Sequence, residues 1–167
     1  YPIKKGSKWA YEDANTFSLF ALGDTLYHDT VYARICTESG FALVLIRKEK
    51  GKYYRRTNLY GNFLEERLFL QDNLPVGATW TNLEPWGGKE VNTIVSIDAE
   101  RIINGKKYNQ TIEVKTDYYY EFDQTLTLSY TIQTTYAEGI GVVKSMSQSQ
   151  GLFGQMQESF LTKHEIK

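Results

Sequence analysis

The sequence predicts an all-β domain, or a β-rich α+β one, built on a single curved antiparallel sheet. Apolar and polar residues alternate with period two along the 167 residues, and no stretch of the chain has convincing helical periodicity. Tyr, Phe and Trp make up 14% of the residues, and aromatic side chains favour strands. With only three prolines, long strands keep their backbone donors. Both a half-barrel and a sandwich-like arrangement fit this pattern.

The alternating runs are the candidate strands. They span residues 16–22, 30–37, 41–48, 52–57, 66–71, 90–99, 107–115, 118–123, 125–136, 141–147 and 155–162. One segment is ambiguous, because Asn62 can cap a short helix within residues 60–70. We prefer the strand there.

Glycine-containing turns separate these runs. Asn104-Gly105 stands between two alternating runs, which is the strongest short-range signal for a tight hairpin. Gly51 predicts a second hairpin, because glycine adopts the positive φ that a tight turn requires. Further turns are expected at 138–141 and 85–88.

Two pairs of segments hint at an internal duplication. Gly-Ser-Lys-Trp at 6–9 is echoed by Gly-Ala-Thr-Trp at 77–80, and each follows a lead-in that contains proline. Residues 24–32 align with 100–108, with a polar pair at each turn. The offsets between the two pairs are unequal, so coincidence stays an alternative. We expect one domain over 1–167, in which 1–73 and 74–167 can be related β-meander halves.

The charge balance bears on partners. Nineteen basic and twenty acidic side chains leave a formal charge of −1, so no attraction of the whole domain to nucleic acid or anionic membranes is expected. The longest apolar run, 41–46, is far shorter than the ~18 residues of a membrane span. Because the chain begins at Tyr1, we expect that an N-terminal segment was removed.

No catalytic, cofactor or metal site is predicted. Cys36 is the only cysteine, so it forms neither an internal disulfide nor a cysteine metal cluster, and we expect it to be a small buried residue. His28-Asp29, with Asp24 nearby, has the composition of an acid–base pair. The preferred interpretation is a turn, since His and Asp tolerate positive φ. His164 lies near the C-terminus and is expected to be exposed.

Other candidates for catalysis are also weak. Ser7 and Ser39 lie near glycines but have no recognisable base partner in the sequence. Glu65 and Glu66 are adjacent, so on a strand they face opposite sides. The chain is therefore expected not to be an enzyme. Glycosidase carboxylates are normally distant in sequence, so a glycan hydrolase stays an open alternative.

Six positive charges fall between Arg47 and Arg56, interleaved with Tyr53 and Tyr54. Such a segment can bind single-stranded nucleic acid or an acidic glycan. The preferred interpretation is a solvated hairpin whose charged edge discourages edge-to-edge association.

An aromatic cluster, Tyr118, Tyr119 and Tyr120 with Phe122, is followed by Tyr130. On a strand Tyr118 and Tyr120 share one side and Tyr119 takes the other. Packing into the core is the commoner role for such residues. The alternative is a ligand surface, for which Tyr118, Tyr119, Tyr120 and Tyr130 are the candidates.

The segment 136–145, Tyr-Ala-Glu-Gly-Ile-Gly-Val-Val-Lys-Ser, resembles an element near the C-terminus of exported bacterial lipoproteins of unknown function, sometimes grouped as TapB-like. Two more anchors match: Pro-x-x-x-Gly-x-x-Trp at 2–9 and Pro-Val-Gly-x-x-Trp at 75–80. The resemblance implies a curved antiparallel sheet, a Gram-negative periplasmic or cell-surface location, and a lipid anchor upstream of Tyr1. It carries no catalytic residues.

We therefore expect a non-catalytic, monomeric envelope lipoprotein domain that binds or scaffolds another component. The partner classes are an envelope protein, a glycan or a lipid, and membrane association is expected only through the lipid anchor. Alternatives are a carrier that holds an apolar ligand in a half-barrel cavity, and a glycan hydrolase.

Overall fold

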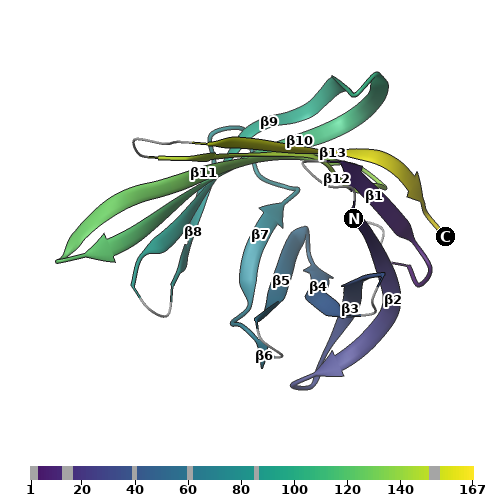
Figure 1. Ribbon diagram of the computed structural model, residues 1–167, viewed down its shortest axis with the longest axis horizontal. Helices are drawn as coiled ribbons and strands as arrows, with labels where there is room; N and C mark the ends of the chain where they lie inside the picture. Colours follow the sequence, from purple (N-terminus) through teal and green to yellow (C-terminus); the bar gives the residue numbers. More distant parts are fainter. Residues whose placement is uncertain (1–3, 13–16, 39–40, 60–61, 85–86, 151–154) are drawn as a thin grey trace. The chain divides into compact units, whose positions relative to one another are not determined.

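The computed structural model describes residues 4–12, 17–38, 41–59, 62–84, 87–150 and 155–167 (Figure 1). These residues form strands and turns, and no helix in them is long and apolar enough to cross a membrane. The strands are β1 (Lys8–Glu12), β2 (Phe17–Tyr27), β3 (Thr30–Thr37), β4 (Ala42–Glu49), β5 (Lys52–Leu59), β6 (Asn62–Phe63), β7 (Arg67–Gln71), β8 (Thr79–Leu83), β9 (Lys89–Ile103), β10 (Lys106–Phe122), β11 (Thr125–Ala137), β12 (Gly141–Ser149) and β13 (Met156–Glu165).

The predicted all-β antiparallel fold is confirmed. The hydrogen-bonded strand order is β6-β5-β4-β3-β2-β1-β13-β12-β11-β10-β9-β8, and β7 pairs with β5 outside this path. Neighbours in the order are mostly neighbours in the chain. The order begins at β6 and ends at β8, so the sheet is not closed.

Each predicted strand has a counterpart, but two details of the prediction were wrong. The runs 107–115 and 118–123 are one strand, β10, because Asp117 between them is satisfied inside the sheet by the hydroxyl of Thr131 at 2.7 Å. The short strands β1, β6 and β8 were missed, since two to five residues carry too little pattern. The strand preferred over a helix near residues 60–70 is confirmed by β7; β6 also lies in this segment, and residues 60 and 61 fall outside the described residues.

Two-residue turns join the long hairpins. In each, both central residues have positive φ, the type I′ geometry that matches the twist of the flanking strands. The predicted turns at Asn104-Gly105 and Gly51 are confirmed. The four turns are His28-Asp29 (φ 47° and 58°), Lys50-Gly51 (48° and 78°), Asn104-Gly105 (47° and 72°) and Asp123-Gln124 (46° and 58°). The turn at 138–141 is also present, with Gly139 at 70°. In the looser turn at 85–88, Pro85 and Trp86 lie outside the described residues.

The chain divides into two compact units. Unit 1 comprises Tyr1–Asn73 and Leu161–Lys167, and unit 2 comprises Leu74–Phe160. Apolar side chains form the core of each: Trp9, Ile35 and Leu45 in unit 1 are at most 4% exposed. In unit 2, Ile94 and Val114 face each other across β9 and β10 and are each 1% exposed. Burying each such side chain contributes roughly 1.5–3 kcal/mol.

Near its N-terminal end, each unit has the same pair of backbone hydrogen bonds around a glycine. The amide of Gly6 donates to the carbonyl of Ala21 at 2.8 Å, and that of Gly77 donates to Ile94 at 2.9 Å. The return bonds, from Ala21 and Ile94 to the residue after each glycine, measure 2.9 and 3.0 Å. Both glycines have φ near +86°, with values of 87° and 85°. The single domain and its related halves stay predictions.

Gly88 provides a sharp test of the fold of unit 2. Its φ is +100°, and a Cβ added there would lie 2.2 Å from the carbonyl oxygen of Tyr119. We expect Gly88→Ala to lower the free energy of unfolding by at least about 3 kcal/mol, through left-handed strain together with the backbone clash. Gly105→Ala is the matched control, because a Cβ at Gly105 meets no atom within 4 Å and only the strain of φ +72° applies. Urea denaturation would measure both, and equal losses would contradict the packing described.

Candidate functional site

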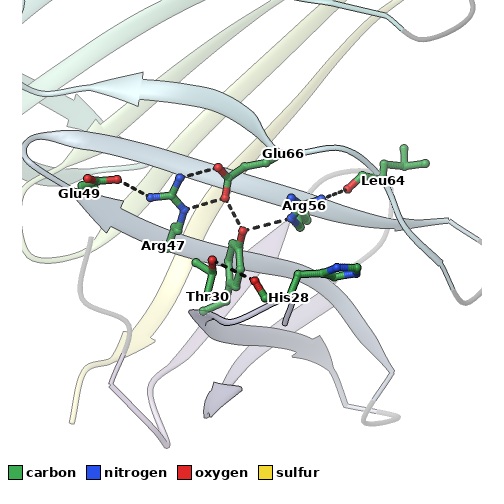
Figure 2. A network of polar contacts seen from close by, with 8 residues as sticks. His28, Thr30, Arg47, Glu49, Arg56, Leu64 and Glu66 are labelled. Carbon is green, nitrogen blue, oxygen red and sulfur yellow. Dashed lines mark hydrogen bonds and ion pairs between the residues drawn. The ribbon is translucent and has the colours of Figure 1, made fainter. Parts of the chain in front are cut away.

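The most connected polar cluster lies in unit 1, around the carboxylate of Glu66 (Figure 2). Arg47 holds it in a two-point fork, with Nε 2.7 Å from Oε1 and Nη2 2.5 Å from Oε2. The hydroxyl of Tyr32 donates to Oε1 at 2.5 Å. Arg47 also donates to Glu49 at 2.8 Å. Glu66 stands just before β7, so this cluster ties that segment to strands β3 and β4.

Arg56 on β5 extends the cluster. Its Nε donates to the hydroxyl of Tyr32 at 3.1 Å, and its Nη1 donates to the carbonyl of Leu64 at 3.0 Å. The guanidinium lies 5.3 Å from the ring centroid of Tyr27, while that of Arg47 lies 4.0 Å from the ring of Tyr54. Such cation–π contacts favour arginine over lysine at both positions.

The cluster sets the charge state of its members. Burial pushes the pKa of Glu66 upward, but hydrogen bonds from Arg47 and Tyr32 and the charges of Arg47 and Arg56 outweigh it, so the pKa is lowered. The pKa of Arg47 is raised, chiefly because its guanidinium donates hydrogen bonds to Glu66. Both groups therefore stay ionised at neutral pH, which suits an ion pair that holds structure.

A second polar cluster accounts for more of the cationic segment. Lys48 Nζ lies 2.6 Å from the hydroxyl of Tyr53 and 3.0 Å from Asp72, and the same hydroxyl donates to Asp72 at 2.8 Å. The prediction of a charged edge hairpin was wrong in its placement. Strand β5 pairs with β4, β6 and β7, so the hairpin is covered on both sides, and Arg47, Lys48 and Arg56 are used in contacts inside unit 1.

His28 and Asp29 occupy a turn, as the preferred interpretation had it. Both are exposed, with φ of 47° and 58°. The ring of His28 rests against Tyr27 at a centroid distance of 4.4 Å and points away from Glu66 (Figure 2). No acid–base arrangement with Asp24 is formed among the described contacts of His28.

The other single residues have ordinary surroundings. Cys36 is buried and unbridged, and burial raises the pKa of its thiol against the opposing charge of Arg34. Ser7 is fully buried and accepts from the amide of Lys167 at 3.3 Å. Ser39 lies outside the described residues. Glu65 is exposed while Glu66 is in its cluster, and no group of three His, Cys, Asp or Glu in the described chain is placed to hold a metal ion.

His164 was expected at a solvent-exposed chain end, which was wrong. It is half-buried within β13, because this terminal strand is held in the sheet by bonds such as that from Thr162 Oγ1 to the carbonyl of Ala10 at 3.0 Å. There it lines a groove of about 240 Å³ on β1, β2 and β13. The other residues that line the groove include the small Ala10 and Ser18 and the charged Lys8, Glu38, Lys163 and Glu165. It is smaller than most ligand pockets.

The predicted aromatic surface lies on the β10–β11 hairpin of unit 2. Tyr118 and Tyr130 are opposite each other, and their rings stack with centroids 4.2 Å apart and planes 16° from parallel. Tyr120 lies on the same face and is 49% exposed. Tyr119 takes the opposite face, where Lys89 Nζ lies 5.6 Å from its ring centroid. The structure therefore brings three of the four candidates together and separates Tyr119 from them.

Phe122 belongs to the same face and is 74% exposed. We call Tyr118, Tyr120, Phe122 and Tyr130 the aromatic face. Past the pair Tyr119–Lys89 and the backbone hydrogen bond from Gln150 to Ser129, the two strands pair only with each other among the described residues. Figure 1 shows this hairpin end, in green, extending past its neighbours in unit 2. Large aromatic side chains on such a projection are available to a partner.

Polar groups that sequence reasoning missed stand beside the aromatic face. Glu90 pairs with Tyr118 across the sheet, is 2% exposed, and accepts from Asn82 Nδ2 at 3.0 Å. One row further, Thr116 Oγ1 donates to Asn92 Oδ1 at 2.8 Å, and Asn92 Nδ2 has no hydrogen-bond partner among the described residues. The only signal in the sequence is the spacing Glu90-x-Asn92, which places both on one face of a strand.

The comparisons with known proteins support the fold. No protein-family model matches the chain, and no curated protein matches it. A candidate lipoprotein from Parabacteroides distasonis, known from a crystal structure, is similar with a TM-score of 0.52 over 99% of this chain and 97% of that one. The two sequences are 8% identical, so the likeness shows a shared fold.

Glu66 makes the stability of unit 1 pH-dependent. Because its pKa is lower in the folded protein, the stabilisation is complete above the unfolded value of about 4.3 and is lost as pH falls through the folded pKa. We expect Glu66→Gln to cost about 1–3 kcal/mol at pH 7 and to flatten the loss of stability below pH ~4.3.

Glu49→Gln is the matched control. Glu49 pairs with the same arginine, Arg47, but its side chain is 57% exposed. Its expected cost is within about 0.5 kcal/mol. Thermal melts from pH 3 to 7 would compare both variants with the wild type. If Glu66→Gln loses stability at low pH as steeply as the wild type does, Glu66 is not the group responsible for that loss.

Proposed function

We propose that the chain is a non-catalytic domain of an envelope lipoprotein, and that it binds another envelope component through the aromatic face of unit 2. The observation that carries this proposal is the exposure of Tyr120 and Phe122 beside the stacked pair Tyr118–Tyr130. A fold needs no aromatic side chain 74% exposed at a hairpin end, and such residues are typical anchors of binding surfaces.

The envelope part of the proposal rests on two likenesses. The candidate lipoprotein from Parabacteroides distasonis shares the fold over nearly the whole chain. The segment 136–145 and the two proline–glycine–tryptophan anchors resemble exported lipoproteins of the TapB-like group. Both point to a cell-envelope location. The apolar carrier and the glycan hydrolase stay alternative predictions, which no observation on the described residues favours.

The aromatic face can be tested by site-specific crosslinking. A photoreactive phenylalanine analogue at position 122 of the full-length protein, expressed in its native host, is expected to form a discrete adduct with one envelope component. The same analogue at position 126 is the matched control, because Leu126 is 45% exposed on the opposite face of the same hairpin. Tyr120→Ser should remove the adduct from position 122 without unfolding the domain, since exposed substitutions usually change stability by about 0.5 kcal/mol or less.

Equal adducts from positions 122 and 126, or none from either, would contradict the role of the aromatic face. The lipoprotein assignment has its own test in the same cells. Labelled palmitate is expected to enter the full-length protein, and an unlabelled protein in the cytoplasmic fraction would contradict it.

A further inference from the structure

Three arginines, Arg34 on β3, Arg47 on β4 and Arg56 on β5, lie on the same face of the sheet. Arg34 is opposite Leu45, which is opposite Arg56, so the two arginines stand on either side of Leu45 in one row. Arg34 also follows Tyr32 by two residues on β3 and therefore shares its face. Arg56 donates to the hydroxyl of Tyr32, a side chain that comes from the same strand and the same face as Arg34.

The carboxylate on this face, that of Glu66, already has hydrogen-bond partners. The carboxylate of Glu66 accepts two hydrogen bonds from Arg47 and one from Tyr32. Arg56 has an uncharged hydroxyl and a carbonyl as its hydrogen-bond acceptors. Within the part of the chain that the structure describes, Arg47 is paired with two carboxylates, Glu66 and Glu49, whereas Arg34 and Arg56 form no ion pair, although the charge of Arg56 acts on Glu66.

Arg34 has the less satisfied side chain of the two. Its Nε is buried and has no acceptor among the described residues, and no hydrogen bond or ion pair of its outer nitrogens is formed with them. A buried donor that has no hydrogen-bond acceptor costs about 1–3 kcal/mol of stability, and a charged donor costs more. Gly23 stands opposite Arg34, and the side-chain carbons of Lys5 lie 3.3–3.5 Å from the position that a Gly23 Cβ would take.

The charge of the whole unit favours the same kind of ligand. Unit 1 carries thirteen Lys and Arg against ten Asp and Glu, whereas unit 2 carries six against ten. The near-neutral total hides a net charge of +3 in unit 1 and −4 in unit 2. An anion approaching unit 1 is attracted by this excess.

We propose that Arg34 and Arg56 form a binding site for a phosphate group on unit 1. Guanidinium forks bind phosphate oxygens by paired, charge-assisted hydrogen bonds. A phosphate group has enough terminal oxygens to accept from two guanidinium groups at once. Both arginines are half-buried, so part of each side chain is open to solvent while the rest is held by the protein.

Inorganic phosphate is the first probe. Sodium phosphate is titrated at constant ionic strength into the purified domain, and binding is followed by calorimetry and by the shift of the melting temperature. The wild type is expected to show saturable binding, and Arg34→Met is expected to weaken it at least tenfold. Lys52→Met is the matched control: it removes one positive charge from an exposed site on the same unit, and less than a twofold change is expected.

A measurement without phosphate separates a binding role from a structural one. In phosphate-free buffer of low ionic strength, Arg34→Met should melt at the same temperature as the wild type or higher, because it removes an uncompensated charge. A lower melting temperature, or equal phosphate affinity in the two proteins, would overturn the proposal. If Arg34→Met does not fold, Arg34→Lys replaces it: the lysine keeps the charge without the fork, and unchanged affinity would count against the site.

Vesicles identify the source of the phosphate group. Phosphatidylglycerol vesicles that bind the wild type but not Arg34→Met, and from which inorganic phosphate displaces the protein, would assign the site to a lipid headgroup. Phosphatidylcholine vesicles control for adhesion to bilayers. Binding of inorganic phosphate alone assigns it to a free phosphate compound, and an absence of saturable binding to every probe rejects the site.

Discussion

The tight left-handed turns constrain everything else in this protein. Each places two residues at positive φ, which brings the next strand directly beside the last with a fixed register. The backbone groups of the long strands are then satisfied by neighbours close in sequence, and the strand order follows the chain from β1 to β5 and from β8 to β12. Strands of up to 17 residues become possible, such as β10. The side chains are free to serve packing on one face and contacts on the other.

The two units use that freedom differently. In unit 1 the short segment before β7 is held by the carboxylate of Glu66, which accepts hydrogen bonds from Tyr32 on β3 and Arg47 on β4. Arg47 and Arg56 beside this carboxylate contribute to the positive net charge of the unit. In unit 2 the long hairpin extends beyond its neighbours and presents stacked and exposed rings. The candidate surfaces are therefore different in chemistry, one cationic and one aromatic, and each is built within a single unit.

The resemblance to exported lipoproteins rests on residues that build the fold. Within 136–145, Tyr136, Ala137 and Val143 are buried, while Gly139 and Gly141 have φ of 70° and 104° in the turn between β11 and β12. Such positions specify a turn and its packing, and they say nothing of a ligand. The same holds for the fold shared with the Parabacteroides protein at 8% identity. Fold and motif agree on architecture, and function has to be read from the surfaces that the motif does not include.

The sequence by itself determined the local features: the strands with strong alternation, the hairpins at Gly51 and Asn104-Gly105, the burial of Cys36, and the turn at His28-Asp29. These follow from backbone preferences and period two, which act over a few residues. Only the tertiary structure decided which side chains meet. Glu66 reaches Tyr32 from 34 positions away. Tyr130 stacks on Tyr118 because the register shifts at Ser129, and Arg34 comes to share a face with Arg56 through pairing across β4. A shift of one residue in register moves a side chain to the other face, and register depends on pairing and bulges that no local pattern encodes.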